Sequence, residues 1–443
     1  MSYLNLISLL GIPVMLALAW LMSSHRSKVN LRLVVLGILL QFSLAALLFQ
    51  SQNWTFDGMF ENGILFAAVD GFFNSLIEFV EAGTGFVFKS HGVKPDHTNP
   101  MVLLSTFAFG VLPTVIFFAA LMSILYHIGL MQIVIRAMAW TMQKTLGTTG
   151  PESLAAAANV LVGHTEAPLV VKPYVAGMTR SELNALMVGG FSTITGSLMA
   201  IFVAKGISAG HLLSASIISA PAALVIAKIL QPETEKVADA NELVAQMEQP
   251  ATNVIEAAAI GASDGMKLAI NIAAMLIAFL ALIAMLDAML GGTGNLIQWL
   301  ILKGSGNVVE IDWSLDRLFG AIFYPLAWIM GIQAADCSIA GQLLGKKMVV
   351  NEFVAYLGLA EVTAGEAAEN SVTISERSKV ILTYALCGFS NFGAIGIQIG
   401  GIGPLAPERR SDLAQLGLRA MVGGMLACCM TACMAGLLYG VLR

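Results

Sequence analysis

The sequence predicts an all-α polytopic membrane protein with about eight transmembrane helices and two re-entrant helical hairpins in inverted repeats. The composition predicts this fold class, because apolar residues of the AVILMFWYC set make up 57% of the 443 residues and charged residues (DEKR) only 12%. Ordinary globular chains hold about 45–50% apolar and about 25% charged residues. A soluble enzyme, a collagen and a disordered chain are therefore excluded, because this chain cannot cover its own surface with charge.

The apolar residues gather into eight runs, each long enough to cross a hydrocarbon core of ~30 Å. The runs are 4–22, 33–49, 103–125, 185–203, 212–230, 268–290, 380–402 and 421–442. No Lys or Arg precedes the first run, whereas Arg26, Lys28 and Arg32 follow it. A secretory signal carries its positive charge in front, so we expect an uncleaved first span. By the positive-inside rule this span starts outside, and eight spans then leave both termini outside.

The same pattern divides the chain into four regions. Residues 1–100 hold the N-terminal spans and an external interfacial segment, a scaffold, and 101–230 hold a first repeat. Residues 231–265 are a polar loop with acidic residues from Glu233 to Glu256, and 266–443 hold a second repeat. We interpret the loop as solvated and cytoplasmic, because acidic residues hardly influence orientation.

Two apolar regions, 151–178 and 335–362, differ from the spans because polar residues lie in their middle. These polar residues are Asn159, His164, Thr165 and Glu166 in the first region, and Asn351 and Glu352 in the second. A charge at the bilayer centre costs about 3 kcal/mol even on mild scales, so these side chains must face protein or water. Two limbs of ~14 residues, each ~21 Å long, pass the middle of the core and turn back. Each region is therefore predicted to be a re-entrant helical hairpin with a polar tip.

An internal repeat supports the hairpins. A tryptophan precedes each hairpin, Trp140 and Trp328, and a similar core follows each one: Gly190-Phe191-Ser192-Thr193 and Gly388-Phe389-Ser390-Asn391. Three spans separate the starts of the two copies, an odd number, so the copies are expected to be inverted. Inverted repeats with discontinuous helices mark many secondary transporters, whose substrate site lies between the repeats near the midplane.

The residues at the predicted breaks suit a neutral ligand rich in hydroxyls and ring nitrogens. Glu166 and Glu352 accept hydrogen bonds, Asn391 and Thr165 donate and accept, and His164 adds an imidazole. Intramembrane carboxylates are costly and functional by default, whereas Thr193 and Asn391 serve equally well as contacts between helices. His164 alone fits either a core histidine or a ligand contact.

The sequence lacks the residues that several other kinds of binding site require. The formal net charge of -5 provides no basic surface for nucleic acid. The residues at the hairpin tips offer no cationic clamp for a phosphate or carboxylate, since Lys172, Arg180, Arg377 and Lys379 lie nearer the membrane surfaces. Gly341 to Gly345, followed by Lys346 and Lys347, has three intervening residues instead of the four that a phosphate-binding loop needs.

Four runs resemble the concentrative nucleoside transporter family, which includes bacterial nucleoside permeases. They are Gly163-His164-Thr165-Glu166-Ala167-Pro168, Gly261-Ala262-Ser263-Asp264-Gly265, Asn351-Glu352-Phe353-Val354-Ala355-Tyr356 and Cys387-Gly388-Phe389-Ser390-Asn391. The resemblance extends from about Leu103 to the C-terminus. It implies an ion-coupled secondary active transporter, not an enzyme and without a cofactor. It further implies a homotrimer that imports nucleosides across the bacterial inner membrane.

The resemblance also implies roles for single residues. The base would contact His164, Thr165 and Glu166, and the ribose would contact Glu352 and Asn391, with Phe389 lining the pocket. A sodium site would comprise Asn159, Val162, Thr193 and Ile194. Two positions depart from the family pattern: many members have glutamine where this chain has His164, and a ribose-binding serine is replaced by Ala394.

Three alternatives stay open at this stage. A carrier of another small polar solute, such as a free nucleobase, needs a similar pocket, and a membrane-embedded transferase needs a catalytic set that is not visible. The third alternative is a carrier coupled to protons instead of sodium, which needs only a carboxyl whose pKa is raised by burial, such as Glu166 or Glu352. The oxygen-bearing side chains of Asn159 and Thr193 favour sodium.

Overall fold

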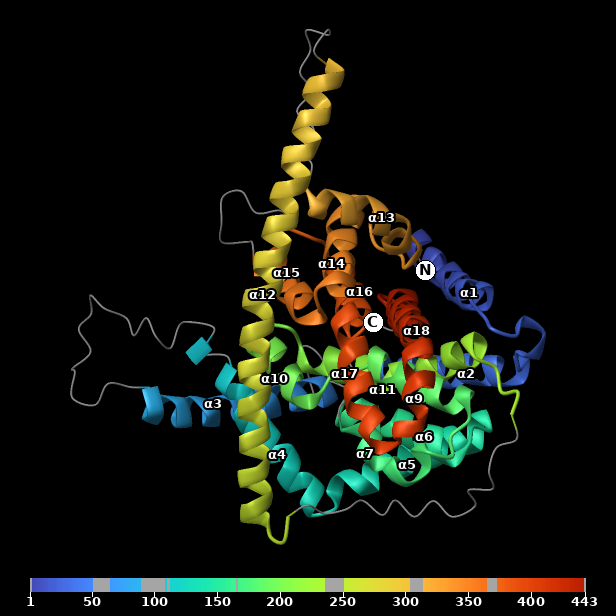
Figure 1. Cartoon of the computed structure of the whole chain (residues 1–443), viewed down its shortest axis with the longest axis vertical. Helices are drawn as coiled ribbons and strands as arrows, with labels where there is room; N and C mark the ends of the chain where they lie inside the picture. Colours follow the sequence, from blue (N-terminus) through green and yellow to red (C-terminus); the bar gives the residue numbers. More distant parts are fainter. Residues whose placement is uncertain are drawn as a thin grey trace.

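The computed structural model describes residues 2–50, 64–88, 108–109, 112–164, 166–235, 251–302, 314–364 and 373–441. Within these ranges the regular secondary structure is helical throughout (Figure 1). The N-terminal helices are α1 (Tyr3–Leu21), α2 (Leu31–Gln50), α3 (Ile64–Phe88) and α4 (Leu112–His127). Short 3-10 turns lie at Arg26–Lys28, Gly403–Leu405 and Pro407–Arg409.

The next helices run twice through the same order. The first series is α5 (Leu130–Leu146), α6 (Gly150–Leu161), α7 (Ala167–Val170), α8 (Lys172–Val175), α9 (Arg180–Ser192), α10 (Gly196–Ala204) and α11 (Ala209–Leu230). The second series is α13 (Leu315–Ile329), α14 (Cys337–Val349), α15 (Glu352–Ala364), α16 (Glu376–Leu386), α17 (Phe392–Ile402) and α18 (Arg410–Leu438). Each series has a tryptophan-bearing helix, a hairpin, a broken helix and a long buried helix, so the same succession of elements occurs twice.

We call α6–α8 hairpin 1 and α14–α15 hairpin 2. Hairpin 1 begins on a capping box, in which Thr149 and Glu152 satisfy each other's backbone amides and Pro151 needs no partner. Its second limb is divided into two short turns, α7 and α8, each with a proline near its start. Hairpin 2 has two continuous limbs of 13 residues each.

Both broken helices restart on a capping side chain. Thr195 Oγ1 accepts a hydrogen bond from the Leu198 amide at the start of α10, and Asn391 Oδ1 accepts one from Ala394 at the start of α17. A side-chain oxygen at this position satisfies one of the amides that a helix start leaves free. The chain therefore leaves the helix at 193–195 and at 387–391 without losing all of its hydrogen bonds.

The core lies where α9, α11 and α18 meet, and most residues of these helices are buried. Glycine permits the closest approach between them. A Cβ at Gly424 of α18 would lie 2.9 Å from the carbonyl carbon of Phe191 in α9, so any other residue would push these two helices apart.

The longest helix, α12 (Val254–Leu302), runs along one side of the molecule and projects beyond the other helices (Figure 1). It packs closely on α4, because a Cβ at Gly261 would lie 2.6 Å from the Ala119 carbonyl oxygen. Ser123 also donates a 2.8 Å hydrogen bond to the carbonyl of Ala257. Elsewhere on α12 large apolar residues are exposed, and Ile277 is 74% exposed.

Within the described residues, six helical stretches are long and apolar enough to cross a membrane. They are Tyr3–Leu21, Leu31–Gln50, Arg180–Ala204, Ala209–Leu230, Val254–Gly294 and Pro407–Leu438. The bent pair α4 and α5, joined at 75°, makes a seventh candidate. The remaining predicted span, 380–402, is the broken pair α16–α17, and part of the predicted span 103–125 lies outside the described residues.

One predicted boundary is wrong. The polar loop was expected to extend to residue 265, but α12 begins at Val254. The Asn253 side chain accepts a 2.9 Å hydrogen bond from the Glu256 amide, and the run of alanines after Glu256 favours a helix. Residues 236–250 of this loop lie outside the described residues.

Candidate functional site

The tips of the two hairpins lie against the breaks of the two discontinuous helices. At the tip of hairpin 1, Gly163 has a φ of +83°, and a Cβ there would overlap the side chain of Thr195 in the α9–α10 break. At the tip of hairpin 2, Glu352 contacts Asn391 in the α16–α17 break. Four pieces of irregular backbone far apart in sequence thus surround one region of the molecule.

Glu352 and Asn391 form the polar pair predicted for the ribose. The Asn391 amide donates a 3.1 Å hydrogen bond to the Glu352 carboxylate, and both side chains are 3% exposed. Asn351, directly before Glu352, accepts a 2.9 Å hydrogen bond from the Val354 amide and so caps α15. The cap fixes the start of the helix on which Glu352 is the first residue. The carboxylate keeps acceptor capacity for hydroxyl groups of a ligand.

His164, a predicted base contact, lies against Phe389, which was predicted to line the pocket. Their ring centroids lie 4.1 Å apart at an interplanar angle of 56°. His164 is buried, and neither ring nitrogen has a hydrogen-bond partner within the described part of the chain. A buried imidazole without a partner is costly, so this ring is available to a polar ligand.

The other two predicted base contacts differ from His164. Glu166 is exposed, unlike the buried Glu352, and it interacts electrostatically with Asp264 of α12. Thr165 lies outside the described residues. The structure therefore unites His164, Phe389, Glu352 and Asn391 around the hairpin tips, whereas the exposed Glu166 lies within electrostatic range of Asp264 in α12.

The predicted sodium ligands gather where α6 and α9 end. Asn159 Nδ2 donates to the Ala155 carbonyl of its own helix at 3.0 Å, whereas its buried Oδ1 has no partner among the described residues. A Cβ at Gly189 would lie 2.9 Å from Asn159 Nδ2, and Thr193 Oγ1 donates to the Gly189 carbonyl at 3.0 Å. Asn159 and Thr193 therefore converge on one glycine.

Val162 and Ile194, the other two predicted sodium ligands, lie just beyond the ends of the same helices. Val162 follows the last residue of α6, and Ile194 follows the last residue of α9 by two positions. Carbonyl groups at helix ends lack the partner that a continuing helix would supply. The donor set of one amide oxygen, one hydroxyl and backbone carbonyls consists of the hard oxygen ligands that suit sodium.

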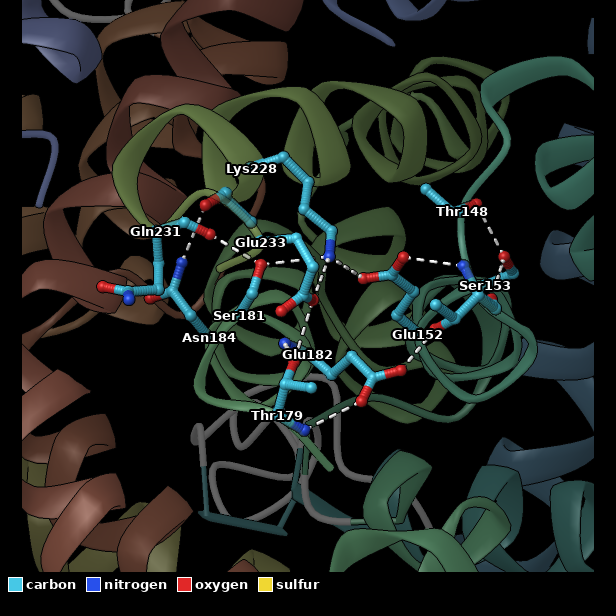
Figure 2. Close-up of polar contacts among 12 residues, drawn as sticks. Thr148, Glu152, Ser153, Thr179, Ser181, Glu182, Asn184, Lys228, Gln231 and Glu233 are labelled. Carbon is cyan, nitrogen blue, oxygen red and sulfur yellow. Dashed lines mark hydrogen bonds and ion pairs between the residues drawn. The ribbon is translucent and has the colours of Figure 1, made fainter. Parts of the chain in front are cut away.

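The base of hairpin 1 carries a buried network of charged residues that the sequence patterns did not reveal (Figure 2). Lys228 of α11 pairs with Glu152 of α6 at 2.6 Å, donates to Ser181 at 3.0 Å and pairs with Glu233 at 3.4 Å. The Thr149 hydroxyl donates to Glu182 of α9 at 2.6 Å. The network fastens the first limb of hairpin 1 to α9 and α11.

Two further polar residues near the hairpin tips were also missed. Gln398 of α17 donates to the Met187 carbonyl at 3.2 Å, and a Cβ at Gly190 would meet both Gln398 and His164 at 2.7 Å. Lys347 of α14 is fully buried and donates to the Ala385 carbonyl at 2.8 Å. Gln398 was visible as the only polar residue between apolar neighbours, and Lys347 as a cation one helical turn before Asn351.

Three family models match successive parts of the chain. The model described as Na+ dependent nucleoside transporter N-terminus matches residues 10–91, and the corresponding C-terminus model matches residues 211–436. Between them, a model described as Gate, nucleoside recognition, matches residues 108–209. The last range includes hairpin 1 and the first broken helix.

Similar proteins match over nearly the whole chain. A Haemophilus influenzae protein described as an uncharacterized transporter is 43% identical over 98% of both chains. Human sodium/nucleoside cotransporter 1 is 39% identical over 98% of this chain, which spans 64% of that longer protein. A solved structure of CNTnw in an inward-facing substrate-bound state is 39% identical, with a TM-score of 0.86 over 99% of this chain and 98% of that chain.

These findings confirm the predicted fold class of a polytopic helical membrane protein with helical hairpins, and they exclude the membrane-embedded transferase. The chain belongs to the Na+ dependent nucleoside transporter family, whose members are ion-coupled carriers.

Proposed function

We propose that this chain imports nucleosides by symport with sodium and holds the nucleoside between the two hairpin tips. The observation that carries the proposal is the meeting of two pairs, Glu352 with Asn391 and His164 with Phe389, at the helix breaks. One pair supplies a carboxylate and an amide, and the other supplies an imidazole beside an aromatic face. A nucleoside needs both kinds of contact, for its ribose hydroxyls and for its base.

The ribose is assigned to Glu352 and Asn391. A carboxylate accepts hydrogen bonds from two neighbouring hydroxyls, and such charge-assisted bonds are stronger than neutral ones. Ala394, which replaces a serine of the family pattern, supplies no hydroxyl here, so Glu352 carries more of the ribose recognition. A free nucleobase has no ribose to offer, which makes a nucleobase the less favoured substrate.

The base is assigned to His164, Thr165 and Glu166, with Phe389 as an aromatic wall. The imidazole has two ring nitrogens, of which a neutral ring uses one as donor and one as acceptor. A base edge likewise offers both donors and acceptors. The two unpartnered nitrogens of His164 support this assignment.

The coupling ion is assigned to Asn159, Val162, Thr193 and Ile194. The unpartnered Oδ1 of Asn159 supports sodium in this position, because a proton carrier needs no cage of oxygen ligands. The ion would join the end of α6 to the break between α9 and α10. Sodium binding would thereby order the hairpin 1 tip before the nucleoside arrives, which couples the two binding events.

The same family likeness supports a proposal on assembly and location. We propose a homotrimer in the bacterial inner membrane, in which α12 contributes to the contact between protomers. The exposed apolar residues of α12 support this contact, among them Ile277 at 74% and Ile270 at 60% exposure. The regions 1–100 and α12 would form the scaffold, and the two repeats around the hairpins would move within it.

Uptake into proteoliposomes tests the function. We expect radiolabelled uridine to accumulate when sodium is present outside at fixed pH, and to stop accumulating when choline replaces sodium. Excess unlabelled adenosine or uridine should compete, whereas uracil should not. Uptake that ignores sodium but collapses with a protonophore would contradict sodium coupling, and uptake of uracil in preference to uridine would contradict the nucleoside.

A further inference from the structure

The two hairpin tips differ in how completely their polar atoms are satisfied. At hairpin 1, the Oδ1 of Asn159 and both ring nitrogens of His164 are buried and lack partners within the described chain. The described residues of hairpin 2 contain no buried side-chain polar atom of this kind. Hairpin 1 therefore leaves buried polar atoms for a ligand, whereas the buried polar side-chain atoms in the described residues of hairpin 2 already have partners in the protein.

Three side-chain hydrogen bonds fasten hairpin 2 to the α16–α17 break. The Lys347 ammonium on the first limb donates to the Ala385 carbonyl at 2.8 Å. The Tyr356 hydroxyl on the second limb donates to the Thr383 carbonyl at 2.6 Å. The third bond is the one from Asn391 to Glu352 at the tip. Both limbs thus bind the last carbonyls of α16, which a helix end leaves free.

The tip of hairpin 1 has no equivalent bonds. Among the described residues, no hydrogen bond joins residues 153–164 to the α9–α10 break at 193–195. Asn159 and Thr193 instead bond to carbonyls of their own helices. The residues of the proposed sodium site lie on these two pieces: Asn159 and Val162 on the first, and Thr193 and Ile194 on the second.

Lys347 is an unusual residue for its position. It has no exposed surface, and a buried ammonium is stable only with partners. The carbonyl end of α16 carries a partial negative charge from the helix dipole, and the Glu352 carboxylate lies within electrostatic range. One positive charge is therefore held between the first limb of hairpin 2 and the end of the broken helix.

We propose that Lys347 is a built-in cation that fastens hairpin 2 to its broken helix, in the role that sodium takes at hairpin 1. This inference rests on the proposed sodium symport. Each repeat then has a cation between a hairpin limb and a helix break, but only the cation of the first repeat can leave. Lys347 is a positioning residue: it holds Glu352 opposite Asn391 at all times, and only hairpin 1 responds to the coupling ion.

Hydrogen exchange on the full-length wild-type protein tests the asymmetry without a substitution. We expect sodium to slow amide exchange in residues 150–175 of hairpin 1 by at least threefold, and to leave exchange in residues 337–364 of hairpin 2 unchanged. Equal protection of both hairpins by sodium would overturn the inference.

The variant Lys347→Met tests the charge, because methionine keeps a long unbranched side chain without the ammonium. We expect exchange in hairpin 2 to accelerate with or without sodium, and uridine affinity to fall at least tenfold. The sodium concentration for half-maximal uptake at saturating uridine should change less than twofold, a separation that general misfolding would not produce.

Lys346→Met is the matched control. This neighbouring lysine is partly exposed and pairs with Asp316 at 2.9 Å, away from the helix break. We expect wild-type uridine affinity and wild-type hydrogen exchange in hairpin 2 of Lys346→Met.

Wild-type uridine affinity and wild-type hydrogen exchange in Lys347→Met would overturn the inference even if sodium-driven uridine uptake is intact. Failure of the proposed function is distinct, because wild-type uptake would then ignore sodium.

Discussion

The side chain of Asn391 joins two functions in one residue: its Nδ2 donates a 3.1 Å hydrogen bond to Glu352, while its Oδ1 caps α17 by accepting from Ala394 at 2.8 Å. The cap fixes the rotamer, so the amide is presented to Glu352 without further cost of ordering. Glu352 in turn is the first residue of α15, and its position is set by the hairpin. The carboxylate that we assign to the ribose is therefore oriented before any ligand binds.

Glu352→Gln is expected to weaken uridine binding about tenfold or more. Hydrogen bonds to a charged group contribute about 1.5–3 kcal/mol, and a neutral amide loses part of this for each ribose hydroxyl. The measurement is calorimetric binding of uridine to the purified protein. As a control, Glu361→Gln changes a carboxylate later in the same helix and should leave binding unchanged. Unaltered uridine affinity in Glu352→Gln would refute the ribose assignment.

Asn159→Ala and Thr193→Val are expected to raise the sodium concentration for half-maximal uridine uptake about tenfold each. Each change removes one oxygen ligand and nearly preserves the backbone, so the melting temperature should change little. The matched control is Ser192→Ala, because the Ser192 hydroxyl donates at 3.0 Å to the same Gly189 carbonyl as Thr193 but is not one of the proposed sodium ligands. If Ser192→Ala raises the sodium concentration for half-maximal uptake as much as Thr193→Val does, the result would argue against a localised ion site.

His164→Gln is expected to change the ratio of adenosine to uridine affinity at least threefold. Glutamine replaces a ring with donor and acceptor nitrogens by a flexible amide, and it loses the aromatic contact with Phe389 at 4.1 Å. Competition of both nucleosides against labelled uridine uptake measures the ratio. His127→Gln, at the end of α4, serves as a control histidine. If the ratio is the same in wild type and His164→Gln, the histidine is a core residue and not a base contact.

Glu152→Gln and Lys228→Met are each expected to lower the melting temperature by about 5 °C or more. Removal of one partner from a buried ion pair costs about 3–5 kcal/mol, because the other charge stays buried. The double variant should be less destabilised than the two single changes would suggest together, since no unpaired charge remains. Lys379→Met, which breaks a partly exposed pair with Glu376, should change stability by no more than about 0.5 kcal/mol. Strictly additive losses in the double variant would contradict a coupled pair.

Much of the fold could be predicted because it depends on properties that are local in sequence. The apolar runs correspond to α1, α2, α4, α11, α12, α18 and the two broken helices, since a helix that crosses a membrane needs about 20 apolar residues. The hairpins were recognisable because Glu166 and Glu352 interrupt runs that are too polar in the middle to face lipid. The repeated Phe-Ser core, which supported an internal repeat, lies at the two helix breaks, at Thr193 and Asn391.

Tertiary structure decided which of these residues meet. The contact between Glu152 and Lys228 of another helix could not be predicted from the sequence, nor could the contact between Lys347 and the last turn of α16. Such contacts depend on how the helices pack and not on the periodicity of each helix. The start of α12 at Val254 was also hidden, since polar residues in its first turns suggest a loop until the Asn253 cap is seen. By itself the sequence determined the number of apolar segments and the chemistry at their breaks, because hydrophobicity and helix propensity act within a few residues. Only the packing of hairpins on broken helices decided that one hairpin is satisfied by a lysine and the other keeps its polar atoms free, because that balance is set by contacts between residues distant in sequence.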